Sequence, residues 1–195
     1  MEQKNVDMEY LLESLIDIEI DNLVNCKSAI DIEMVQRLTN DILEAPEVVV
    51  IGSRSSNVLV SYATYILNKI GIRTSGYDAA DTKTLDNINN VDRTALIIAF
   101  GFPRYPKSTI VTTRFLKNKG YKIVSVTDKR KSPLAELSDY SFRLQATSYG
   151  FTDTYASGML LLNLVAALIG RIQSADTKRH LREFDETARQ LDFYF

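Results

Sequence analysis

The sequence predicts an α/β fold: a five-stranded parallel sheet in an α/β/α sandwich with flavodoxin-like strand order, preceded by two N-terminal helices. Three observations predict it. Short β-branched runs such as residues 47–52 (EVVVIG) alternate with longer segments of helical periodicity. Glycines at positions 71 and 120 follow two of those segments, where helices commonly end. The chain has 195 residues, 45% apolar and 25% charged, as expected for one globular domain with a sizeable core.

Residues 1–45 form a predicted helical segment for linkage or dimerisation, and residues 46–195 form the predicted sheet domain. Apolar residues at helical spacing between positions 8 and 24 indicate the first helix. Asp31 suits the N-cap of a second helix, which Pro46 ends. One face of that second helix carries Met34, Val35, Leu38 and Ile42.

The remaining elements alternate along the chain. Strands are predicted at residues 47–52, 72–77, 94–100, 121–128 and 140–144. Helices are predicted at residues 57–70, 107–119, 155–170 and 175–192, with a short helical turn at 132–139. Because this alternation gives right-handed crossovers, the strands should be parallel and covered on both faces.

Two loops are expected to meet at the carboxyl edge of this sheet. In the order 2-1-3-4-5 the first and third strands are neighbours, and ligands bind beyond their carboxyl ends. Those ends are GSRSS (52–56) and GFPRYP (101–106), each with one arginine. Amides at a helix start and two guanidinium groups suit a phosphate or carboxylate. The alternative is a serine-rich helix cap beside a turn stiffened by two prolines. The predicted ligand-binding residues are Ser53, Arg54, Ser55, Ser56, Arg104, Tyr105, Lys107 and Ser108.

The charge distribution and the absence of certain motifs argue against several classes of function. Residues 1–50 carry 12 acidic and 3 basic side chains, and residues 51–195 carry 13 and 20. No direct nucleic-acid contact is expected from the acidic front end, whereas the positive remainder could attract a small anion. Neither Gly-x-Gly-x-x-Gly after the first strand nor a Gly-Lys-Ser/Thr motif occurs. One histidine and one cysteine cannot form a usual zinc site, so no metal or cofactor is expected.

The sequence favours a cytoplasmic protein without a membrane span. Cys26 is its only cysteine, which fits a reducing compartment, and no basic n-region follows Met1. The most apolar segment, residues 155–169, is shorter than the roughly 20 residues that a span needs. This segment and the apolar face of residues 8–24 can each lie in the core or in a dimer interface. At least one is expected to cross a subunit boundary, giving a homodimer or tetramer.

Two motifs carry a family resemblance. They are IGSRSSNVLVSYATYILNKIG (51–71) and IVSVTDKRKSPLAELSDYSFRL (123–144), and the stretch from Val124 to Asp139 is the most specific. They resemble the sugar isomerase (SIS) domain, most closely the effector domain of RpiR-type transcriptional regulators. The resemblance runs from about residue 30 to the C-terminus. It implies a five-stranded parallel α/β/α sandwich, a phosphosugar ligand, and dimerisation or higher assembly.

The chain departs from that family in two loops and at its front end. The usual second loop, Ser-x-Ser-Gly-x-Thr, holds the phosphate through hydroxyls, but residues 101–106 read Gly-Phe-Pro-Arg-Tyr-Pro. Arg54 stands where the family usually has a second glycine, while Ser56 matches its serine. The departure implies that arginines hold the anion, which leaves a sugar phosphate, a sugar acid or another anion as the ligand. The regulators' N-terminal helix-turn-helix domain has no counterpart here, which fits either a fragment or a free-standing SIS protein.

Two functions follow from this resemblance. The first is a ligand-sensing module, whose occupancy by a phosphosugar alters assembly and thereby DNA binding by a separate domain. The alternative is a phosphosugar isomerase, which needs a base, often Glu or His, to move a proton beside a carbonyl. The candidate catalytic residues are His180 and Glu183, which share the last predicted helix and would reach the site from a partner subunit.

Overall fold

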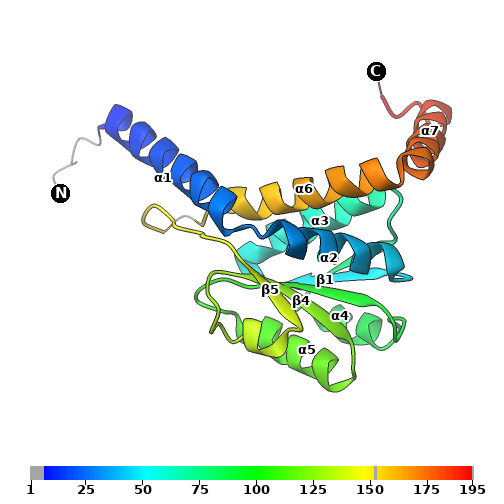
Figure 1. The fold of residues 1–195 in the computed structure, drawn as a ribbon, viewed down its shortest axis with the longest axis horizontal. Coiled ribbons are helices and arrows are strands. Elements are labelled where there is room, and N and C mark those ends of the chain that lie inside the picture. Colours follow the sequence, from blue (N-terminus) through cyan, green and yellow to red (C-terminus); the bar gives the residue numbers. More distant parts are fainter. Residues whose placement is uncertain (1–6, 152, 195) are drawn as a thin grey trace.

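A five-stranded parallel sheet forms the centre of the protein, and the computed structural model describes residues 7–151 and 153–194 (Figure 1). The strand order is β2-β1-β3-β4-β5, and every pair of neighbours runs parallel. The strands are β1 (Val48–Gly52), β2 (Thr74–Asp78), β3 (Leu96–Phe100), β4 (Lys122–Thr127) and β5 (Tyr140–Arg143). The predicted fold class and strand order are confirmed.

Helices cover both faces of the sheet. In Figure 1, α2, α3 and α6 lie on one face and α4 and α5 on the other. Helix α1 projects past the start of α6, and α7 follows the end of α6. The helices are α1 (Met8–Ala29), α2 (Ile32–Glu44), α3 (Asn57–Lys69), α4 (Thr82–Ile88), α5 (Lys107–Asn118), α6 (Ala156–Ile172) and α7 (Ser174–Gln190). Two short 3-10 turns occur at Arg54–Ser56 and Ala135–Leu137.

Each central strand contributes to two separate cores. In β1, Val48 and Val50 pack with α2, α3 and α6, whereas Val49 and Ile51 pack toward α4 and α5. Successive strand side chains point to opposite faces, so a strand covered on both sides needs apolar residues at every position. This is why the strands appear in the sequence as continuous apolar runs.

The predicted helix ends are mostly confirmed. The Asp31 carboxylate accepts hydrogen bonds from the N–H groups of Glu33 and Met34 and caps α2. Gly71 and Gly120 have φ of +91° and +86° and follow α3 and α5. One element was not predicted: α4 has seven residues, of which Thr84 and Ile88 are buried, and this is too short for a periodic signal.

Helix α6 lies directly against α3. A Cβ added at Gly158 would come within 2.8 Å of Cδ1 of the fully buried Leu59, so the two helices approach through a position without a side chain. Near the other end of α6, a Cβ at Gly170 would meet no atom within 4 Å. The two glycines of one helix therefore differ in their tolerance of alanine.

Hydrogen-bonded carboxylates fix the edge of the sheet at β5. Asp139 accepts hydrogen bonds from the Ile123 N–H at 2.7 Å and from Lys117 at 2.8 Å. Burial acts to raise the pKa of Asp139, but these hydrogen bonds and the lysine charges outweigh burial and lower it. The Tyr140 hydroxyl donates to Asp41 at 2.7 Å, which joins β5 to α2.

Two helices keep apolar side chains on the surface of the chain. Met8, Leu12, Ile16 and Ile20 of α1, spaced four residues apart, are 48–68% exposed. One face of α6 enters the core, but Leu160 and Ile172 remain 39% and 56% exposed. Within the described residues, no individual helix has the length and apolarity to cross a bilayer; α6 and α7 together meet criteria of length and composition but are bent by 105°.

Candidate functional site

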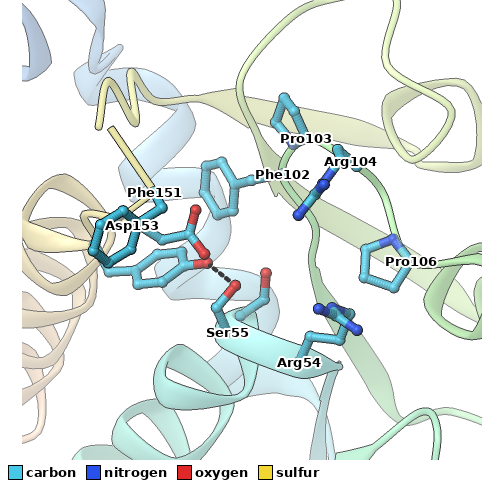
Figure 2. A pocket seen from close by; sticks show the side chains of 10 residues that line it. Arg54, Ser55, Phe102, Pro103, Arg104, Pro106, Phe151 and Asp153 are labelled. Carbon is cyan, nitrogen blue, oxygen red and sulfur yellow. Dashed lines mark hydrogen bonds between the residues drawn. The ribbon is translucent and has the colours of Figure 1, made fainter. Parts of the chain in front are cut away.

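The loops after β1 and β3 meet beyond the carboxyl edge of the sheet, because these two strands pair directly. A cavity of about 560 Å3 lies between them (Figure 2). A third segment, just before α6, closes one side of it. The cavity is lined by Arg54, Ser55, Ser56, Phe102, Pro103, Arg104, Pro106, Phe151, Asp153 and Tyr155.

The first loop presents Arg54 in an unusual backbone conformation. Its φ is +56°, in the left-handed region that favours glycine. An L-residue there costs roughly 1–2 kcal/mol relative to a right-handed conformation. The residue is exposed and forms no ion pair with another described residue. Strain at a cavity-lining arginine is typical of a residue retained for function.

Ser53 joins the first loop to the start of α5. Its hydroxyl is buried and lies 3.0 Å from the Ser108 hydroxyl and 2.8 Å from that of Thr109. These hydroxyls satisfy one another, as buried polar groups must. Ser53 and Ser108 therefore hold the two loops together and lie outside the cavity lining.

The second loop is anchored at the opposite end of its turn by Tyr105. The Tyr105 N–H donates to the Phe102 carbonyl at 2.7 Å, and its hydroxyl donates to Asp128, after β4. Burial raises the pKa of the Tyr105 phenol, and the hydrogen bond to Asp128 raises it further. With Tyr105 directed at Asp128, Arg104 is the residue of this turn whose charged group lies at the cavity (Figure 2).

The third wall was not predicted from the sequence. The Tyr155 hydroxyl donates to Ser55 Oγ at 2.8 Å, and its ring packs edge-on against Phe102 at 5.7 Å between centroids. Ser55 accepts this hydrogen bond, so its own proton remains available to a ligand. Phe151 and Asp153 complete this wall and lie across the cavity from Arg54 and Arg104 in Figure 2.

Helix α1 holds this third wall in position. The Asn22 side chain donates to the Thr147 carbonyl at 2.9 Å and accepts from its N–H at 3.2 Å. The buried Thr154 hydroxyl donates to Glu19 at 2.6 Å. These contacts join residues more than 120 positions apart in the sequence. The only sequence signal for the wall was an aromatic and acidic segment immediately before a buried helix.

The charges around the cavity are opposed but unpaired. The lining holds two guanidinium groups and one carboxylate, so its formal charge is positive. Among the described residues, none of Arg54, Arg104 and Asp153 has an ion-pair partner within 4.0 Å. Within residues 7–151 and 153–194, no group of three or more His, Cys, Asp or Glu side chains could hold a metal ion. The arrangement suits a small anion with additional polar groups.

Comparisons with known proteins agree with this architecture. The model of the SIS domain matches residues 41–168, more than half of the chain. The chain belongs to the SIS domain family. The loops after β1 and β3, which border the cavity, both lie within the matched residues.

The SIS chain is similar in sequence to a curated enzyme and in fold to two solved structures. A glutamine–fructose-6-phosphate aminotransferase (isomerizing) of Sulfurisphaera tokodaii is 26% identical over 142 residues, covering 69% of this chain but 23% of the relative. The chain therefore spans less than a quarter of that enzyme. The sugar isomerase domain of an RpiR transcription factor from Sphaerobacter thermophilus has a TM-score of 0.86 at 23% identity, covering 90% of this chain and 98% of that one. The Vibrio vulnificus NanR protein, complexed with ManNAc-6P, has a TM-score of 0.78 at 19% identity, covering 97% and 71%.

Four of the eight ligand-binding residues predicted for the SIS chain line the cavity. They are Arg54, Ser55, Ser56 and Arg104. Tyr105 is hydrogen-bonded to Asp128, and Ser53 and Ser108 are hydrogen-bonded to each other, as described above. Lys107 is exposed at the first position of α5, outside the lining. The role of all eight in ligand binding stays a prediction.

The candidate catalytic residues lie elsewhere in the chain. His180 and Glu183 are on α7, which begins where α6 ends, far from the α6 start at the cavity (Figure 1). His180 packs against Gly71 at the end of α3. Glu183 is exposed and pairs with Arg179 at 3.9 Å. Neither lines the cavity of its own chain.

Proposed function

We propose that this SIS chain binds a small anionic sugar, in first place a sugar phosphate, in the cavity between the loops after β1 and β3. One observation carries the proposal: two guanidinium groups from the two loops line one cavity, and neither is neutralised by a described carboxylate. A phosphate monoester carries about −1.5 to −2 charge at pH 7 and accepts bidentate hydrogen bonds from arginine.

The names of the relatives support the same ligand class. The Vibrio vulnificus NanR structure is a complex with ManNAc-6P, and the Sulfurisphaera tokodaii relative is named for fructose 6-phosphate. The cavity, at about 560 Å3, is within the size range of small-molecule sites, roughly 300–1,000 Å3. The arginines take the place of the hydroxyl groups that usually hold the phosphate in this family.

We further propose that ligand occupancy is sensed rather than converted, as in the effector domain of an RpiR-type regulator. The described cavity lining contains one carboxylate and no histidine, whereas α1 contacts the segment before α6, through Glu19 to Thr154 and through Asn22 to Thr147. Movement of this segment on ligand binding would therefore displace α1. Long incubation of the protein with a bound sugar phosphate should return the ligand unchanged, and conversion of the sugar would contradict the sensing role.

Self-association is part of this proposal. The exposed apolar residues of α1 form a stripe along one side of the helix, and water-exposed stripes of this kind commonly mark protein contacts. We propose that α1 packs against a second copy of the chain, giving a homodimer or a larger assembly. Light scattering after size-exclusion chromatography measures the assembly directly, with and without the sugar phosphate.

Thermal unfolding against a ligand panel tests the binding function. The panel contains hexose and pentose phosphates, sugar acids and inorganic phosphate. A ligand at 100 times its Kd stabilises the folded state by about 2.7 kcal/mol. For a chain of this length that raises the Tm by roughly 5–10 °C. Arg104→Ala, with binding about ten- to a hundredfold weaker, should reduce this stabilisation at the same ligand concentration to about 0.4–1.4 kcal/mol.

Arg114→Ala is the matched control for this experiment. Arg114 is exposed on α5 and lies outside the cavity lining, so its removal changes the net charge equally without touching the site. A full ligand shift in Arg114→Ala and a clearly reduced shift in Arg104→Ala are the expected pair of results. No shift with any ligand, or an equal shift in wild type and Arg104→Ala, would contradict the proposal.

A further inference from the structure

We propose that Asp153 is the specificity-determining residue of this site: it accepts hydrogen bonds from the sugar hydroxyls while Arg54 and Arg104 hold the phosphate. This inference rests on the proposed function and deepens it, because it predicts which part of the ligand each wall contacts. It makes the ligand a hydroxyl-bearing ring phosphate rather than any small anion.

The opposed charges of the two walls carry the inference. Asp153 lies on the wall formed by the segment before α6, and the arginines come from the facing loops (Figure 2). The carboxylate is within 4.0 Å of neither guanidinium group, so the walls are not joined by an ion pair. A ligand that is anionic at one end and a hydrogen-bond donor at the other complements both walls at once.

The overall charge of the cavity favours hydroxyl donors over an ammonium group. Two guanidinium groups and one carboxylate leave the lining with a net positive charge. An ammonium group beside Asp153 would also face the repulsion of both arginines, whereas a hydroxyl donates to the carboxylate without that penalty. The carboxylate has two oxygens and can accept from neighbouring hydroxyls of a sugar ring.

Aromatic side chains lie near Asp153: Phe151 on the same wall, and Phe102 from the loop after β3. Phe102 packs against Tyr155 and is 6% exposed, so it forms a fixed apolar floor. Phe151 is 98% exposed at the mouth of the cavity, and its ring loses water contact when a ligand covers it. An apolar C–H face of a sugar ring, with hydroxyls directed at Asp153, fits these two surfaces.

The chain directly after Asp153 is anchored on both sides of the cavity wall. Thr154 is buried and its hydroxyl donates to Glu19 of α1 at 2.6 Å. Tyr155 donates to Ser55 at 2.8 Å, which ties the segment to the first loop. The two residues that directly follow Asp153 are thus both anchored, which restrains the backbone that carries the carboxylate, as a selective acceptor requires.

The experiment compares two phosphates by isothermal titration calorimetry. One is the sugar phosphate with the largest effect in the thermal panel, beginning with glucose 6-phosphate and ribose 5-phosphate. The other is cyclohexyl phosphate, a ring phosphate without hydroxyls. Wild type should bind the sugar phosphate at least tenfold more tightly. Asp153→Asn should weaken sugar phosphate binding about ten- to a hundredfold, because hydrogen bonds to a charged acceptor are the strong ones.

Cyclohexyl phosphate should respond in the opposite direction. Asp153→Asn removes a negative charge near the phosphate, so its affinity should stay equal or increase. Asp185→Asn, an exposed position on α7 outside the cavity, makes the same charge change and should alter neither Kd. Glucosamine 6-phosphate tests the ammonium group and should bind more weakly than glucose 6-phosphate.

The outcomes separate this inference from the proposed function. If sugar phosphate binding depends on Arg104 but Asp153→Asn changes the affinity for both phosphates equally, the role of Asp153 is overturned and the proposed function stands. Tighter binding of the amino sugar would overturn the preference for hydroxyl donors. Absence of any phosphate binding by wild type would overturn the proposed function and this inference together.

Discussion

Replacing Arg54 with glycine should make the protein more stable and its ligand site weaker. The residue has a φ of +56°, where an L-residue bears a cost of roughly 1–2 kcal/mol that glycine in the same conformation does not. Glycine also gains freedom in the unfolded chain, which opposes the effect by about 0.4–1 kcal/mol. The midpoints of these two ranges give a net increase of about 0.8 kcal/mol in the free energy of unfolding. In a chain of this size that corresponds to a Tm higher by roughly 1–4 °C.

Alanine at the same position is the matched control. It removes the guanidinium group but keeps the Cβ that causes the strain, so Arg54→Ala should show no gain in stability. Both variants should bind the sugar phosphate about ten- to a hundredfold more weakly, because a hydrogen bond to a charged group contributes about 1.5–3 kcal/mol. Stability and affinity thus change in opposite directions in Arg54→Gly alone.

Chemical denaturation and calorimetry on the three proteins measure these effects. Denaturant midpoints with equal m-values give the stability difference directly. Arg54→Gly less stable than Arg54→Ala by about 0.4–1 kcal/mol, the cost of glycine in the unfolded chain, would show that the left-handed backbone carries no strain. Unchanged affinity in both would show that the arginine does not contact the ligand.

Three further predictions concern other parts of the chain. Gly158→Ala should be less stable than Gly170→Ala by about 1–3 kcal/mol in urea denaturation, because its Cβ would meet Leu59 whereas the other gains helix propensity; equal stabilities would contradict the close helix contact. Asp139 has a lowered pKa, so its stabilisation is present above about pH 4 and lost as the pH falls further. The urea midpoint should therefore fall less between pH 7 and pH 3.5 in Asp139→Asn than in wild type. An equal fall in both proteins would refute this. Ile16→Glu should lower the mass measured by light scattering, whereas Val111→Glu, on exposed α5, should not; an unchanged mass in both would exclude the α1 contact.

The elements predictable from the sequence were those with a repeated physical pattern. Strands such as Val48–Gly52 are buried on both faces, so every position is apolar and the run is conspicuous. The strand order then predicts that Arg54 and Arg104 lie close together. Helix α4 could not be predicted because its seven residues bury only two side chains.

The third wall of the site could not be predicted in the same way. Asp153 and Tyr155 reach the cavity through contacts with α1 and the first loop, and no local pattern records such distant partners. Hydroxyl groups were also ambiguous from sequence alone. Ser53 and Tyr105 have the chemistry of ligand donors, but the structure uses their hydrogen bonds to join the loops to α5 and to Asp128.

A crystal structure of the chain with a bound sugar phosphate would test the central claim most directly. The account predicts the phosphate within hydrogen-bonding distance of both Arg54 and Arg104, at the carboxyl edge between β1 and β3. A phosphate bound at Lys107 and the start of α5, with both guanidinium groups directed away from it, would contradict the account.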